Sequence, residues 1–133
     1  MYQGRFKSFP IQQDGHFLMV CRYMERNAVR ANLVTSARRW PWCGLGRREL
    51  RQAPRWLMPL RQCPVRPPSD WKGWVNRPET AAELDVLRQR VKRGRPYGDE
   101  QWEERTARQL GLESALRPRG RQRIRPIKDS RSV

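Results

Sequence analysis

Tyr23 is the residue of this chain whose surroundings best suit covalent chemistry on a phosphodiester. Arg22, Arg26 and Arg30 lie beside it at helical spacing, and guanidinium groups suit phosphates because they offer a planar fork of donors. A phenol has a pKa of about 10, so it needs positive charge nearby, and typically a metal ion on the phosphate, before it can attack. Such a segment can present the Tyr23 phenol to a phosphodiester, with Arg22, Arg26, Asn27 and Arg30 as candidate DNA contacts, but its spacing also fits a purely structural tyrosine.

A helix from Asp14 to about Arg26 is expected to carry the tyrosine. Asp14 is a favourable N-cap, and apolar side chains recur at helical spacing behind it. This apolar stripe consists of Phe17, Val20, Cys21 and Met24. Tyr23 lies at the border of the stripe, on the same side as His16 two turns earlier, so we expect it to be neither fully buried nor fully exposed.

The residues after this helix predict a tight turn and then an irregular region. Asn27 is expected to cap a second short helical segment through Ala31, and Asn32 to take the left-handed conformation that follows a helix. Trp40 to Trp42 is expected to close over the helix as an aromatic corner. Residues 44–78 are rich in Pro, Arg and Trp, which predicts irregular structure there. Their apolar side chains are expected to wrap the core: Leu45, Leu50, Trp56, Leu57, Met58, Leu60, Trp71, Trp74 and Val75.

The ends of the chain predict one strand, two helices and a tail. Residues 2–9 alternate loosely and predict a strand that Pro10 ends. Residues 79–92 predict a helix that Gly94 stops, and Asp99 is expected to cap a last helix that reaches Leu110 and ends at Gly111. Residues 117–133 are basic and rich in Pro and Gly, which is typical of disorder. The expected fold class is mainly α with one N-terminal β-strand.

The net charge of the chain indicates what class of molecule it binds. The 133 residues carry a net charge of +16 and a pI of about 11.4, which favours a polyanion such as nucleic acid. Arg far outnumbers Lys, a bias that phosphate binding and a GC-rich genome both explain. Three widely spaced cysteines form neither a metal motif nor a disulfide framework. With no apolar run of about 20 residues and no signal sequence, we expect a bacterial-type cytoplasmic protein.

Several motifs, in this order, resemble the REP-associated tyrosine transposases, a family of the single-tyrosine HUH superfamily. The family's tyrosine segment reads roughly Tyr-Ile-x-x-Asn-Pro-Val-Arg-Ala-Gly-Leu-Val. Residues 23–34 resemble it, with Met24, Ala28 and Asn32 in place of its Ile, Pro and Gly. The other matching stretches are residues 4–9, 40–43, 70–76, 93–99 with Trp102, and 110–121. The resemblance covers nearly the whole chain, but only the later half of a complete transposase.

The resemblance implies DNA strand cleavage and transfer through a phosphotyrosine intermediate at Tyr23, with Mg²⁺ or Mn²⁺ held by a His-hydrophobic-His pair. His16 is the only histidine, so the pair is missing and we expect no cleavage by this chain alone. The resemblance further implies that Met1 marks an internal start, a frameshift or a deletion, and that most of a ferredoxin-like sheet is absent. An intact transposase relative could then supply the metal half. The expected substrate is single-stranded or hairpin DNA.

Four segments are expected from these patterns. They are a partial transposase domain (1–43), a proline- and tryptophan-rich segment (44–78), a helical extension (79–116) and a basic tail (117–133). Further DNA contacts are expected at Arg93 and Arg95, which belong to a basic cluster at a helix end, and at Arg119 and Arg121 in the tail. Such contacts give affinity with little sequence reading. The helices 79–92 and 99–110 also faintly suggest a helix-turn-helix.

Two other functions fit the same sequence. One is a non-catalytic DNA- or RNA-binding protein, for example a competitor for the sites of a transposase, for which Tyr23→Phe would change nothing. The other is a non-functional fragment that folds poorly, for which circular dichroism would show little helix and no cooperative melting.

Overall fold

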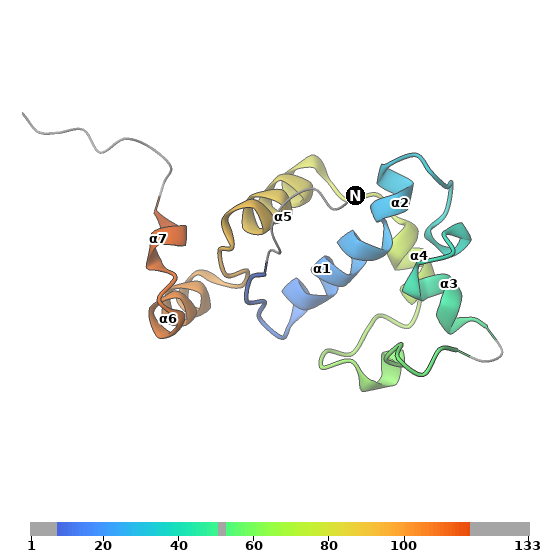
Figure 1. The fold of residues 1–133 in the computed structure, drawn as a ribbon, viewed down its shortest axis with the longest axis horizontal. Helices are drawn as coiled ribbons and strands as arrows, with labels where there is room; N and C mark the ends of the chain where they lie inside the picture. Colours follow the sequence, from blue (N-terminus) through green and yellow to red (C-terminus); the bar gives the residue numbers. More distant parts are fainter. Residues whose placement is uncertain (1–7, 51–52, 118–133) are drawn as a thin grey trace, which may run out of the picture.

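The computed structural model describes residues 8–50 and 53–117, which are mainly helical (Figure 1). The elements are α1 (Gly15–Glu25), α2 (Asn27–Arg30), η1 (Ala37–Arg39), α3 (Gly44–Arg48), η2 (Leu60–Gln62), α4 (Trp71–Asn76), α5 (Ala81–Arg93), α6 (Glu100–Leu110) and α7 (Glu113–Leu116). The mainly α class is therefore confirmed.

The described residues contain no sheet, and their one β pairing is an isolated parallel bridge between Ile11 and Tyr97. The bridge is flanked by hydrogen bonds from Gln12 N–H to the Tyr97 carbonyl (3.0 Å) and from Tyr97 N–H to the Pro10 carbonyl (2.9 Å). The strand expected over residues 2–9 lies almost wholly outside the described residues. The ferredoxin-like origin of the fold stays a prediction.

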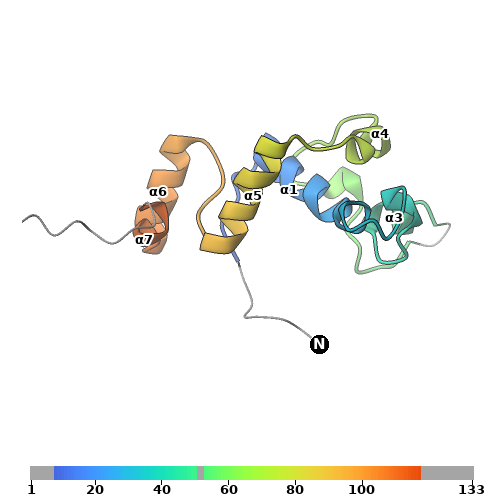
Figure 2. The same ribbon diagram turned by 90° about the horizontal axis from the view of Figure 1, so that it is seen from above.

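Helix α1 lies between two hydrophobic clusters. The α4 cluster consists of Ala37, Cys43, Leu45, Trp71 and Val75, with Leu18 and Cys21 of α1 packed against it. The α5 cluster consists of Val20, Leu87 and Tyr97, with Met19 and Tyr23 packed against it. Figure 2 shows the helices from above, with α1 and α5 at the centre, α3 and α4 towards one end, and α6 and α7 at the other. Burial of apolar area on both sides of α1 is the main source of its stability.

This two-sided packing corrects the single apolar stripe expected for α1. Met24 is 69% exposed, because it lies on neither of the two buried faces. Tyr23 is half-buried beside the α5 cluster, which agrees with its expected place at a border. Asp14 caps α1 as predicted, accepting a hydrogen bond from the His16 N–H at 2.8 Å.

The turn after α1 differs in detail from the expectation. Asn27 is the first residue of α2 and not its cap, since Arg26 keeps a right-handed helical conformation (φ −85°) and the chain turns without an extended cap residue. Asn32 does take the left-handed conformation, with φ 55°, as predicted.

Residues 44–78 are less irregular than expected, because they begin with α3 and end with α4. The Asp70 carboxylate caps α4 by accepting a hydrogen bond from the Gly73 N–H at 2.8 Å, which stabilises the start of a helix. Trp71 and Val75 are buried as predicted, and Trp74 packs against them. The expectation was wrong for Trp42, Leu50, Trp56 and Met58, which are exposed.

The later helices follow their local signals closely. Thr80 and Glu83 form a reciprocal capping box at the start of α5, two residues later than the expected start. Gly94 (φ 65°) and Gly111 (φ 66°) end α5 and α6 in the left-handed conformation, where a residue without Cβ is favoured. Asp99 caps α6. The short helix α7 was not expected.

Candidate nucleic-acid interface

Arg22, which precedes the candidate nucleophile, is buried and points to the connection between α4 and α5. Its Nη2 donates hydrogen bonds to the carbonyls of Arg77 (2.9 Å) and Pro78 (2.8 Å). Its guanidinium lies over the Trp74 ring, 5.0 Å from the centroid. These contacts join α1 to the loop after α4, so the side chain has a structural role as it stands.

Arg26 and Arg30 share one buried carboxylate, that of Glu79. Arg26 Nε is 2.8 Å from Glu79 Oε2, and Arg30 Nη1 is 2.9 Å from Oε1. The Glu79 side chain is only 1% exposed, and a buried charge is tolerated when it is paired and hydrogen-bonded. Arg26 also donates to the Asn76 carbonyl at 2.5 Å. Three arginines of the tyrosine segment thus clamp residues 76–79.

Tyr23 is held in place by Arg30 but has few other polar contacts. The Arg30 guanidinium lies over the Tyr23 ring at 3.9 Å, and its Nη2 donates to the Tyr23 carbonyl at 2.7 Å. No hydrogen bond to the Tyr23 hydroxyl is found within residues 8–50 and 53–117. The cation therefore faces the ring, and no described side chain is in place to take the phenol proton.

His16 is occupied by structural contacts. Its Nδ1 is 2.8 Å from Asp14 Oδ1, and its ring meets the Tyr97 ring edge-on at 4.8 Å. Within the part of the chain that the structure describes, no three or more His, Cys, Asp or Glu side chains gather as metal ligands would. These residues therefore do not fit the Mg²⁺ or Mn²⁺ that the family resemblance implies.

A second buried glutamate organises the basic end of α5. The Oε1 atom of Glu103 lies 2.8 Å from Arg90 Nη2, and its Oε2 lies 2.8 Å from Arg95 Nη2. Burial lowers the pKa of Arg90, with Glu103 opposing the change. Arg95, an expected DNA contact, thus has an internal partner while its side chain stays partly exposed.

The other expected DNA contacts lie elsewhere. Arg93 is the last residue of α5 and lines a shallow hollow beside α7, with Lys92 and Leu112. No ion pair or hydrogen bond of the Arg93 side chain is found among the described residues. Asn27 is exposed at the start of α2, and Arg119 and Arg121 lie outside the described residues. Of the expected contacts near the tyrosine, Arg30 meets the Tyr23 ring, whereas Arg22 and Arg26 turn towards residues 76–79.

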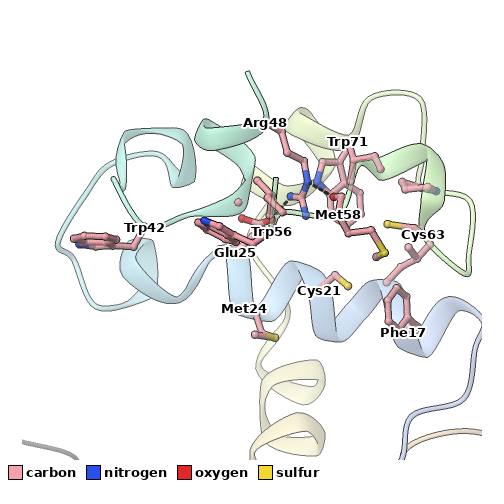
Figure 3. Close-up of a pocket in the computed structure, with 15 residues that line it drawn as sticks. Phe17, Cys21, Met24, Glu25, Trp42, Arg48, Trp56, Met58, Cys63 and Trp71 are labelled. Atoms are coloured by element: carbon pink, nitrogen blue, oxygen red, sulfur yellow. Dashed lines mark hydrogen bonds and ion pairs between the residues drawn. The ribbon is translucent and has the colours of Figure 1, made fainter. Parts of the chain in front are cut away.

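A pocket of about 340 Å³ lies beside α1 and is lined mostly by apolar side chains (Figure 3). Its polar centre is Glu25, whose Oε1 is 2.7 Å from Arg48 Nη1 and whose Oε2 accepts from the Leu45 N–H at 2.9 Å. Cys43 donates its thiol to the same Oε2. Burial, with this hydrogen bond to Glu25, raises the pKa of Cys43 to about 12.

Sequence reasoning missed the residues that organise this region, namely Glu25, Glu79 and Glu103. Each is an acidic residue in a strongly basic chain, and each pairs with one or two arginines in the interior. The available signal was weak: Met24 precedes Glu25, Pro78 precedes Glu79 and Trp102 precedes Glu103. Periodicity alone carries no information on which distant arginine such a residue meets.

Comparison with models of known protein families, with curated proteins and with solved structures found no match. Among the described residues, no helix combines the length and apolar character that crossing a membrane requires.

Proposed function

We propose that this chain is a transposase-type DNA-binding protein that takes single-stranded or hairpin DNA. The observation that carries the proposal is where the positive charge lies. The buried clusters around Glu25, Glu79 and Glu103 contain five arginines and three glutamates, and so only two of the sixteen net positive charges. The other fourteen lie outside these clusters, and exposed arginines such as Arg39, Arg55 and Arg61 can meet a polyanion.

The contacts around Tyr23 support two different roles for the arginines, structural for some and phosphate-binding for others. Arg22 and Arg26 fix the tyrosine segment against residues 76–79, and Arg30 holds the Tyr23 ring. Other arginines make the phosphate contacts. Arg93, which is partly exposed at the end of α5, is one of them, and Arg119 and Arg121 are assigned to this role from the sequence alone. This arrangement gives affinity that depends on salt and little on base sequence.

Covalent attack by Tyr23 on DNA is proposed only when a partner protein is present. Tyr23 would attack a phosphate, so that its oxygen forms a bond to phosphorus while the bond from phosphorus to the 3′ oxygen breaks and that oxygen leaves as a free 3′-OH. Because the described residues do not fit a metal site, an intact transposase relative would have to supply the metal half.

A binding assay tests the DNA-binding part. Fluorescence anisotropy of labelled oligonucleotides would compare a single strand, a hairpin and a duplex of equal length at one salt concentration. We expect the single strand and the hairpin to bind more tightly than the duplex, and Tyr23→Phe to bind as the wild type does. Equal affinity for all three, or no binding, would contradict the proposal.

A gel assay tests the covalent part. With a relative and the labelled strand present, the wild-type chain should give a protein–DNA band that survives denaturation, and Tyr23→Phe should give none. If the wild type gives no such band while it binds DNA, the second candidate applies, a non-catalytic DNA- or RNA-binding protein. The single histidine, already paired with Asp14, favours that candidate for the chain acting alone.

A further inference from the structure

Two tryptophans that were expected in the core stand out at the surface. Trp42 is 74% exposed and Trp56 is 73% exposed. They are separated by α3, and both line the apolar pocket beside α1. Figure 3 shows Trp42 at the end of this pocket opposite to Cys63 and Phe17. Large aromatic side chains left in contact with water carry a cost that contact with a partner would remove.

Arg47 connects the two rings into one surface. Its guanidinium carbon lies 5.2 Å from the centroid of Trp42 and 5.7 Å from that of Trp56. Its Nε donates a hydrogen bond to the Pro41 carbonyl at 2.8 Å, which fixes the guanidinium between the rings. Attraction between the cation and each ring face adds to this order. The surface therefore presents two aromatic planes and one guanidinium plane before any ligand arrives.

The charge around this surface is strongly positive. Residues 35–66 hold eight arginines and one glutamate, and that glutamate, Glu49, is already paired with Arg38. Arg39, Arg55 and Arg61 are exposed in the same segment. Exposed aromatic rings among exposed arginines suit an unpaired nucleic-acid strand, since bases stack on the rings while the cations follow the phosphates. An apolar protein partner would not need this charge.

We propose that Trp42, Arg47 and Trp56 form a stacking platform for the unpaired bases of a single nucleic-acid strand. This platform rests on the DNA binding proposed above, and it is the surface that would make that binding selective for single strands. Bases within a duplex keep their faces covered by neighbouring bases, so the platform contributes little to duplex binding. Stacking tolerates any base, because every base has a π-face.

Alanine and conservative variants of the platform test it, with short oligo(dT) and a duplex of equal length as probes. The double variant W42A/W56A should lose at least about tenfold in affinity for oligo(dT) and little for the duplex. W42F/W56F should recover most of that affinity because Phe still stacks. R47K should bind oligo(dT) more weakly than wild type, although the charge is kept. Leu110→Ala, at an exposed apolar position on α6, is the matched control and should bind as wild type.

Four results would overturn the platform, and they separate its failure from that of the proposed function. If W42A/W56A binds oligo(dT) as wild type does, the platform is wrong and the proposed DNA binding stands. An equal loss for oligo(dT) and duplex would mean that the rings do not read unpaired bases. If the wild type self-associates and W42A/W56A only abolishes that, the rings join two copies of the chain. If the wild type binds no DNA at all, the platform and the proposed function both fail. Thermal melting of each variant checks that it is folded.

Discussion

Replacing Glu79 by Gln is expected to destabilise the protein strongly, because two arginines depend on its carboxylate. Arg26 and Arg30 pair with its two oxygens at 2.8 and 2.9 Å, and the glutamate side chain is 1% exposed. Glutamine keeps the volume and one acceptor oxygen but removes the charge. Both guanidinium groups would then be left largely buried without a counter-charge.

The size of the effect follows from this burial. Removing one partner of a buried ion pair costs about 3–5 kcal/mol. Arg26 keeps its bond to the Asn76 carbonyl, and Arg30 keeps its bond to the Tyr23 carbonyl, so we expect a value near the lower end, about 3 kcal/mol. A domain of this size has a total stability of about 5–15 kcal/mol. The Tm should therefore fall by roughly 10 °C or more.

Urea and thermal unfolding, followed by circular dichroism, would measure this loss. Glu104→Gln is the matched control, since Glu104 is 56% exposed and its oxygen lies 3.7 Å from Arg108; it should cost less than about 0.5 kcal/mol. If Glu79→Gln costs no more than this control, the clamp does not hold the tyrosine segment. Arg26 and Arg30 would then be free for phosphates, as the sequence alone suggested.

Three further predictions concern single positions. The pKa of the Cys43 thiol is raised from 9.0 to about 12, chiefly by burial, so the stabilisation that the neutral thiol provides is complete below pH 9 and is lost as the pH rises towards 12. Urea unfolding midpoints of the wild type should fall over this range, and those of Cys43→Ala should fall less. Gly94→Ala should cost about 1 kcal/mol because φ is 65°, while Gly15→Ala, where an added Cβ meets nothing within 4 Å, should be neutral or slightly stabilising in the same assay. Thr80→Ala should cost about 1 kcal/mol by removing the capping box of α5, and Thr80→Ser should restore most of it; equal stability of all three proteins would contradict the cap.

The later helices could be predicted from the sequence because their signals are local. Asp99, Gly94 and Gly111 act within a turn of the helix end that they define. A capping residue or a left-handed glycine needs no knowledge of the rest of the fold. The same holds for Asp14 and Asn32 in the tyrosine segment.

The contacts of the candidate site depend on distant residues, which is why the sequence did not predict them. Glu79 meets arginines about 50 positions earlier, and neither spacing nor charge shows which of the many arginines it meets. Helical spacing put Arg22 and Arg26 on the same helix as Tyr23, but it did not show that they turn towards residues 76–79. Their expected role as phosphate contacts stays a prediction.

Trp42 illustrates a different limit. A tryptophan between apolar neighbours is usually assigned to the core, because most large aromatic side chains are at least partly buried. Whether a ring is covered depends on the elements that pack over it, and here Trp40 packs against the α4 cluster while Trp42 does not. The exposed pair of rings became visible only with the three-dimensional arrangement.

The most direct test of the account is the salt dependence of the affinity for a single-stranded oligonucleotide. The account predicts that the logarithm of the binding constant falls linearly with the logarithm of the salt concentration, with a slope of about −0.7 for each phosphate neutralised, so that several contacts give a slope of roughly −3 or steeper. A slope near zero, or no binding at low salt, would contradict the central claim that the excess positive charge of this protein serves to bind nucleic acid.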